Sequence, residues 1–223
     1  MNLQDIKIEY DLIVSLGSSC APAINLRRYG LRKFSMPLDW MISASLSDVT
    51  RLIKSRFNRF MAFENLSRLD ETHFYLNDGN PVYDSPDGQS LSKSYFIRDT
   101  EYNIISAHDF PIIPNVDWRS FYPVYRQKLD RRITRFWANL VQSTSSLFIR
   151  WSASYEEVYE LREILSTLLR GRSYTILILN PAEHLTVTRE LPWGMEHVCA
   201  LEVPGDMNDY SNWDFILNGI RLQ

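Results

Sequence analysis

Cysteine is scarce in this chain of 223 residues, which contains only Cys20 and Cys199. Two cysteines do not make the disulfide framework of a small secreted domain, so the sequence indicates no oxidising compartment. Long apolar runs are also missing, and no segment approaches the ~18 apolar residues that a membrane helix needs. Residues 1–7 do not have the pattern of a signal peptide. We therefore expect a cytoplasmic protein without a membrane span.

The chain also lacks an excess of positive charge, because 24 Lys and Arg residues face 27 Asp and Glu residues. A net charge of −3 does not favour a nucleic-acid partner. No Gly-rich phosphate loop, metal-ligand spacing or internal repeat is present, so we expect no metal site. A hydrophobic content of 45% excludes a disordered chain, and the length suits one domain spanning 1–223.

Short aliphatic segments predict five strands, at 12–16, 102–107, 146–151, 174–179 and 198–203. Helical patterns alternate with them, at 21–29, 46–60, 121–142 and 155–170. This order predicts an α/β domain of three layers, with a mostly parallel sheet of about five strands and helices on both faces. A loop-rich insertion is expected at about 63–100, with a hairpin at 74–83 and a turn at 84–88. Such an insertion is often a lid or a specificity element.

The strongest chemical signal is the stretch 12–20, where an aliphatic strand ends at Gly17 and a helix is expected to begin beside Cys20. Free backbone N–H groups and the helix dipole at such a position stabilise a thiolate. We interpret Cys20 as a nucleophile, with the backbone around Ser18 and Ser19 as an oxyanion hole. Two alternatives stay open: a buried cysteine that only packs, and Ser19 as the nucleophile.

A His-Asp pair, His108 and Asp109, follows the strand predicted at 102–107. Ligand sites in open α/β sheets lie beyond the carboxyl ends of the strands, so His108 and Cys20 are expected to converge there. We interpret His108 as the general base, with Asp109 or Asp39 orienting its imidazole. His108 could also be a simple turn residue, and Asp39 could instead cap the helix that follows it.

Arginines supply the candidate substrate contacts. Arg150 ends a predicted strand, and its planar fork suits a carboxylate or a phosphate. Arg32 and Trp40 are further candidates for substrate binding. The helix predicted at 121–142 carries a basic cluster that could hold phosphates or an acidic glycan, although a solvated face is the more common role. Its members are Arg126, Lys128, Arg131, Arg132 and Arg135.

Taken together, five motifs resemble a bacterial family described as papain-like cysteine peptidases. They lie at 15–20, 30–32, 37–40, 108–110 and 131–136. The resemblance implies a Cys-His pair at Cys20 and His108 and a peptide substrate. The turn at 17–19 is also similar to that of SGNH-type esterases and acyltransferases and of capsule-biosynthesis acyltransferases. That second resemblance implies acyl transfer to a polysaccharide, with coenzyme A as the donor.

We therefore expect cysteine-dependent acyl chemistry. Peptide hydrolysis, which requires no cofactor, stands first, and acyl transfer to a glycan stands second. A third hypothesis is a non-catalytic module that binds an anionic glycan or a nucleotide through Arg32, Arg150 and the basic cluster.

Overall fold

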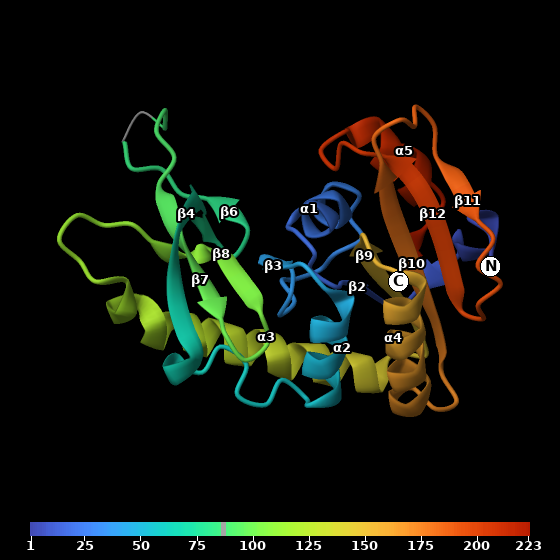
Figure 1. Ribbon diagram of the computed structural model, residues 1–223, viewed down its shortest axis with the longest axis horizontal. Helices are drawn as coiled ribbons and strands as arrows, with labels where there is room; N and C mark the ends of the chain where they lie inside the picture. The colour runs from blue at the N-terminus through green and yellow to red at the C-terminus, as the bar shows by residue number, and fades with distance from the viewer. Residues whose placement is uncertain (86–87) are drawn as a thin grey trace.

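The computed structural model describes residues 1–85 and 88–223 and has a mixed α/β fold (Figure 1). Two β-sheets form separate halves of the molecule, and one long helix runs along both of them (Figure 1). Part of the turn expected at 84–88 lies outside the described residues.

The first sheet is mostly parallel and has the strand order β11-β12-β10-β9-β2. Its strands are β2 (Leu12–Ser15), β9 (Ser145–Trp151), β10 (Ser173–Ala182), β11 (Arg189–Leu191) and β12 (Val198–Pro204). Only the edge strand β11 is antiparallel to its neighbour among the described strands of this sheet. A parallel sheet buried on both faces requires nearly continuous aliphatic strands. For that reason the strands predicted at 12–16, 146–151, 174–179 and 198–203 are confirmed here.

The second sheet is antiparallel and has the order β3-β8-β7-β4. Its strands are β3 (Met41–Ser43), β4 (Leu66–Phe74), β7 (Lys93–Asp99) and β8 (Ile104–Pro111). The expectation that 102–107 belongs to the parallel sheet is therefore wrong. A short turn at Asn103, whose φ is 56°, joins β7 to β8 as a hairpin, so no helical crossover is needed.

The insertion expected to be loop-rich at 63–100 instead supplies two long strands of this second sheet. β4 hides its strand character because most of its side chains are exposed and no alternating apolar pattern results. The small hairpin expected at 74–83 is present as β5 (Leu76–Asn77) and β6 (Asn80–Pro81).

Helices cover both faces of the parallel sheet. Their bounds are α1 (Ala21–Arg28), α2 (Leu46–Lys54), α3 (Tyr122–Gln142), α4 (Tyr155–Leu168) and α5 (Tyr210–Leu217). Apolar residues of α2, α3 and α4 share one core with Phe148, whereas those of α1 and α5 share another with Ile149. α2 ends earlier than the predicted 46–60, because Arg56 and Phe57 have positive φ angles that break the helix.

The remaining elements are short. They are the 3₁₀ helices η1 (Gln4–Ile6), η2 (Phe63–Asn65) and η3 (Trp118–Phe121), and the paired strands β1 (Glu9–Tyr10) and β13 (Arg221–Leu222). Within the described residues, no helix has the length and apolar character needed to cross a membrane.

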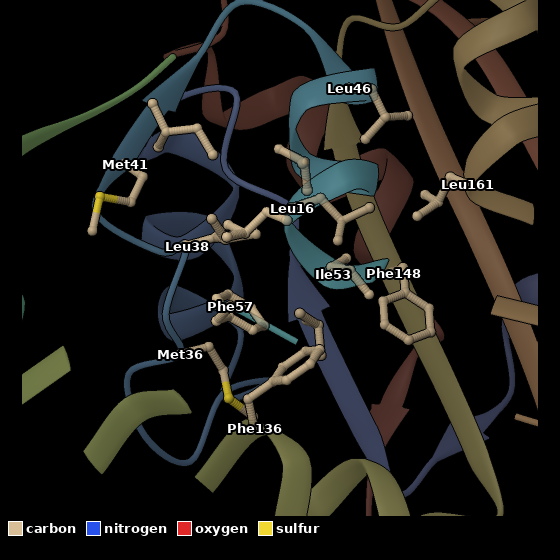
Figure 2. Close-up of a cluster of buried hydrophobic side chains, with 14 of the residues drawn as sticks. Leu16, Met36, Leu38, Met41, Leu46, Ile53, Phe57, Phe136, Phe148 and Leu161 are labelled. Carbon is tan, nitrogen blue, oxygen red and sulfur yellow. The ribbon is translucent and has the colours of Figure 1, made fainter. Parts of the chain in front are cut away.

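α3 connects the two halves of the molecule (Figure 1). Near its start Tyr125 packs against Phe110 of β8, with ring centroids 4.5 Å apart. Further along, Phe136 contacts Phe57 beneath the parallel sheet, at 5.4 Å between centroids. Figure 2 shows Phe57 and Phe136 in the same cluster as Phe148 and Leu16. Residues of both sheets therefore share one continuous core.

Gly17 ends β2 at a position that no side chain can occupy. Its φ is +64°, and a Cβ built there would lie 2.5 Å from the Leu38 carbonyl oxygen. We expect Gly17→Ala to lower the free energy of unfolding by at least about 2 kcal/mol, measured by urea denaturation. Gly171→Ala is the matched control, because Gly171 has a φ of +77° and a Cβ added to it would meet no atom within 4 Å. Equal losses in the two variants would contradict the steric argument.

Candidate functional site

Cys20 lies where the sequence predicts it, at the N-terminus of α1 directly after a strand and a turn. Leu16 extends β2 by donating its N–H to the Ile149 carbonyl, and Gly17 then turns the chain. Cys20 is the N-cap residue of α1, and Pro22 occupies the first turn of the helix. The Cys20 side chain is half-buried.

The direction of the Cys20 pKa does not favour the preformed thiolate that the sequence suggests. Burial raises the pKa of the Cys20 thiol, and its own backbone N–H lowers that pKa by less. The short helix α1 therefore does not outweigh desolvation of the sulfur. Cys199 is fully buried in β12, and burial raises its pKa to about 12. Cys199 is therefore a packing residue of the core.

His108 is buried in β8 with one ring nitrogen in use. Its Nδ1 lies 2.7 Å from the Phe74 carbonyl oxygen. A carbonyl only accepts hydrogen bonds, so Nδ1 carries the proton and the neutral ring leaves Nε2 unprotonated. Burial lowers the pKa of His108, which keeps the imidazole neutral at pH 7. This is the tautomer that a general base requires.

The aromatic surroundings hold the His108 ring in place. Trp40 meets it edge-on at 6.2 Å between ring centroids, and His73 does so at 4.7 Å. Gly79 of the β5–β6 turn covers the Trp40 ring so closely that a Cβ would lie 2.3 Å from it. The sequence did not single out His73 or the Phe74 carbonyl, and a backbone carbonyl leaves no signal in a sequence.

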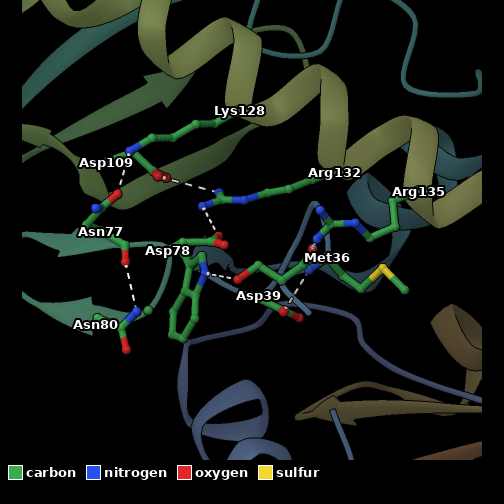
Figure 3. A network of polar contacts seen from close by, with 12 residues as sticks. Met36, Asp39, Asn77, Asp78, Asn80, Asp109, Lys128, Arg132 and Arg135 are labelled. Atoms are coloured by element: carbon green, nitrogen blue, oxygen red, sulfur yellow. Dashed lines mark hydrogen bonds and ion pairs between the residues drawn. The ribbon is translucent and has the colours of Figure 1, made fainter. Parts of the chain in front are cut away.

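Neither aspartate orients His108, contrary to expectation. Asp109 accepts a hydrogen bond from Ser106 at 2.8 Å and forms an ion pair with Arg132 at 3.4 Å. Asp39 accepts from Arg32 Nε at 2.7 Å. It also accepts from the Met36 N–H at 2.8 Å (Figure 3). Burial still raises the pKa of Asp39. The two carboxylates are thus committed to cations and to the backbone.

Arg32 and Trp40 lie together in the structure. The Arg32 guanidinium stacks over the Trp40 ring at 4.8 Å, and both side chains hydrogen bond to Ser35 Oγ. Arg32 also holds Asp39, so it supports the 35–40 loop on which Trp40 lies. Trp40 therefore lies between Arg32, which stacks on its ring, and His108, which it meets edge-on.

Arg150 is buried and hydrogen bonded within the protein. Its side chain is fully buried and donates to the carbonyls of Leu16, Ser43 and Ser152 and to the Ser43 hydroxyl. Burial lowers the pKa of Arg150 to about 10. The expected contact of Arg150 with a substrate carboxylate or a coenzyme A phosphate is therefore not supported.

β3 lies between the Cys20 turn and His108. Ser43 at its end donates its N–H to the Ser18 carbonyl, and Met41 pairs with Ser106 of β8. Among the described residues, no hydrogen bond joins Cys20 to His108. The structure thus places both on elements that flank one strand, and the dyad itself stays a prediction.

The two serines before Cys20 differ in their contacts. Ser19 Oγ accepts from the Ala21 N–H and donates to Met207 Sδ, with no histidine or carboxylate beside it among the described residues. Ser18 Oγ is buried and has no hydrogen-bond partner in the described part of the chain. Ser19 therefore has a capping role and no base to activate it.

In the part of the chain that the structure describes, no group of three or more His, Cys, Asp or Glu residues could hold a metal ion.

Cys20 thus lies in a strand–turn–helix of the parallel sheet, and the neutral His108 lies on a strand of the antiparallel sheet. A family model described as "Putative papain-like cysteine peptidase (DUF1796)" matches residues 11–180, and the chain belongs to this family. An uncharacterized protein of Acanthamoeba polyphaga mimivirus is 29% identical over 181 residues, which cover 77% of this chain and 78% of that protein. No solved structure matches the chain.

These matches support the peptidase resemblance. They give no support to the acyltransferase resemblance, and the relative is viral rather than bacterial. Cys20, His108 and the basic residues of α3 all lie inside the matched region, whereas β12 and α5 lie beyond it.

Proposed function

We propose that this protein is a cysteine hydrolase of the peptidase type, with Cys20 Sγ as nucleophile and His108 Nε2 as general base. The observation that carries the proposal is the hydrogen bond from His108 Nδ1 to the Phe74 carbonyl, which leaves Nε2 free to accept a proton. Family membership adds independent support.

The reaction begins from a neutral pair, because burial raises the pKa of Cys20 and lowers that of His108. His108 Nε2 takes the thiol proton as Sγ bonds to the substrate carbonyl carbon. The protonated imidazole then gives this proton to the leaving amine as the C–N bond breaks. Water, deprotonated by the same nitrogen, hydrolyses the resulting thioester and restores the thiol.

In this scheme, the negative charge that develops on the substrate carbonyl oxygen lies near the N-terminus of α1. The backbone N–H groups of Ser18, Ser19 and Cys20 make no hydrogen bond to another described residue, so they are available as donors. Each such donor contributes about 3 kcal/mol to the transition state. Catalytic hydrogen bonds often tighten only when substrate binds, which suits a Cys-His pair that is not joined beforehand.

The pH profile of peptide hydrolysis tests this proposal. Because the pKa of His108 is lowered, its imidazole stays neutral until the pH falls below its ordinary value of 6.5. We expect kcat/KM for a fluorogenic peptide library to fall only on that acid side. His108→Gln should remove nearly all activity, whereas His184→Gln in an exposed loop should not.

A His73 variant tests the pKa of His108 in a second way. Its charge, when present, contributes to lowering the pKa of His108, so His73→Gln should move the acid limb toward higher pH. A rate that instead falls above neutral pH would show that imidazolium is the active form, and would contradict the neutral pair.

A further inference from the structure

A cavity of about 260 Å³ lies between α3 and the β5–β6 hairpin. It is lined by Asn77, Asp78, Lys128, Arg131, Arg132 and Arg135. Figure 3 shows Lys128 and Arg132 extending from the helix toward Asn77 and Asp78 of the hairpin, whereas Arg135 extends toward the segment at Met36. Four of the six lining side chains are cations, and one is an anion.

The helix geometry explains why these cations meet. Residues 128, 131, 132 and 135 follow the i, i+3, i+4, i+7 spacing, which places them on one face of α3. Like charges at such spacings destabilise a helix by about 0.2–0.5 kcal/mol per pair. Nothing in the stability of α3 therefore favours this arrangement.

Among the described residues, carboxylate partners neutralise only one of these four charges, that of Arg132. Arg132 forms ion pairs with Asp78 at 3.0 Å and Asp109 at 3.4 Å, and its side chain is only 4% exposed. Among the described residues, Lys128 and Arg135 have neutral partners only. Lys128 donates to the Asn77 side-chain oxygen at 3.1 Å, and Arg135 donates to the Ser35 carbonyl at 3.2 Å and stacks over the Phe34 ring.

Arg131 stands apart from the other three. It makes no hydrogen bond or ion pair with any described residue, although its side chain lines the cavity. Arg132 is thus fixed and neutralised by its two ion pairs. The other three cations that line the cavity, Lys128, Arg131 and Arg135, have no carboxylate partner among the described residues.

We propose that this cavity binds an oxyanion group, a carboxylate or a phosphate, through Arg131 and Arg135 with Lys128. Guanidinium groups bind both kinds of oxyanion with charge-assisted, often bidentate hydrogen bonds. The volume holds one such group with a few further atoms, being slightly below that of an ordinary ligand pocket.

The cavity shares its elements with the proposed active site. Asp109, which holds Arg132, directly follows His108 in β8. Arg27 of α1 donates to the Gly79 carbonyl at 2.9 Å, so the hairpin that walls the cavity also touches the helix that begins at Cys20. If the proposed function holds, the cavity selects substrates with an acidic group, and this second step rests on that function.

Titration with inorganic phosphate and with acetate tests the binding itself, with the arginine Nε–H signals followed by NMR. We expect at least one of the two anions to shift the Arg131 and Arg135 signals in the natural chain. Arg131→Gln should weaken that binding about tenfold or more, the effect of one lost charge-assisted hydrogen bond. Arg170→Gln, which removes an equal charge from an exposed position after α4, should leave the affinity unchanged.

The response to the two anions identifies the group. Stronger binding of phosphate indicates a phosphorylated ligand, and stronger binding of acetate a carboxylate. No shift with either anion, or equal weakening by Arg131→Gln and Arg170→Gln, would overturn the proposal. Cys20→Ala should bind the anion normally, so failure of the cysteine chemistry and failure of this site are distinguishable.

Discussion

Cys20→Ala is expected to slow peptide hydrolysis by at least about a thousandfold, the scale on which removal of a covalent nucleophile acts. His108 and the backbone donors at 18–20 would remain, but the sulfur that forms the covalent bond in the proposed mechanism would be lost. Cys20 Sγ is half-buried and makes no hydrogen bond to another residue in the described part of the chain. The substitution should therefore change the free energy of unfolding by less than about 1 kcal/mol.

Two matched variants sharpen this experiment. Cys199→Ala removes the other thiol from the core and should leave kcat/KM unchanged. Ser19→Ala should keep most of the activity, because the Ser19 hydroxyl hydrogen bonds to no described groups other than Met207 Sδ and the Ala21 N–H. Steady-state rates and circular dichroism melts of all three proteins give the measurement. Loss of activity in Ser19→Ala with retention in Cys20→Ala would assign the nucleophile to Ser19 instead.

Arg150→Met should produce the largest loss of stability, about 3 kcal/mol in the free energy of unfolding. The substitution leaves the buried carbonyls of Leu16 and Ser43 without their donor, and each unsatisfied group costs about 1–3 kcal/mol. Relief of desolvation offsets part of this cost, since burial already lowers the pKa of Arg150 to about 10.

Urea denaturation measures the effect of Arg150→Met, with Arg170→Gln as the control. Arg170 is exposed, so its loss should cost less than about 0.5 kcal/mol. Arg150→Lys should lie between the two, because one ammonium group cannot reach all the oxygens that the guanidinium fork reaches. A loss below about 1 kcal/mol in Arg150→Met would contradict the role of Arg150 in joining β2 to β3.

Local patterns in the sequence determined the parallel half of the molecule. Strands buried on both faces must be aliphatic throughout, so those at 12–16, 146–151, 174–179 and 198–203 are recognisable without their neighbours. The capping box of Ser154 and Glu157 is equally local, and it begins α4 where the sequence predicts. The position of Cys20 at a helix N-terminus follows from the same kind of signal.

Only the tertiary structure decided the second sheet and the roles within the site. β4 is mostly exposed, so its pairing with β7 depends on backbone hydrogen bonds that leave no apolar pattern. His108 is oriented by the Phe74 carbonyl, 34 residues away, rather than by the adjacent Asp109. Every residue has a backbone carbonyl, so the sequence of side chains does not reveal which one makes this contact. Arg150 lies near the end of β9, where a ligand-binding arginine would lie, but its guanidinium donates to the hydroxyl and the carbonyl of Ser43 in β3. Burial, which depends on the whole fold, raises the pKa of Cys20 against the local preference of a helix N-terminus for a thiolate.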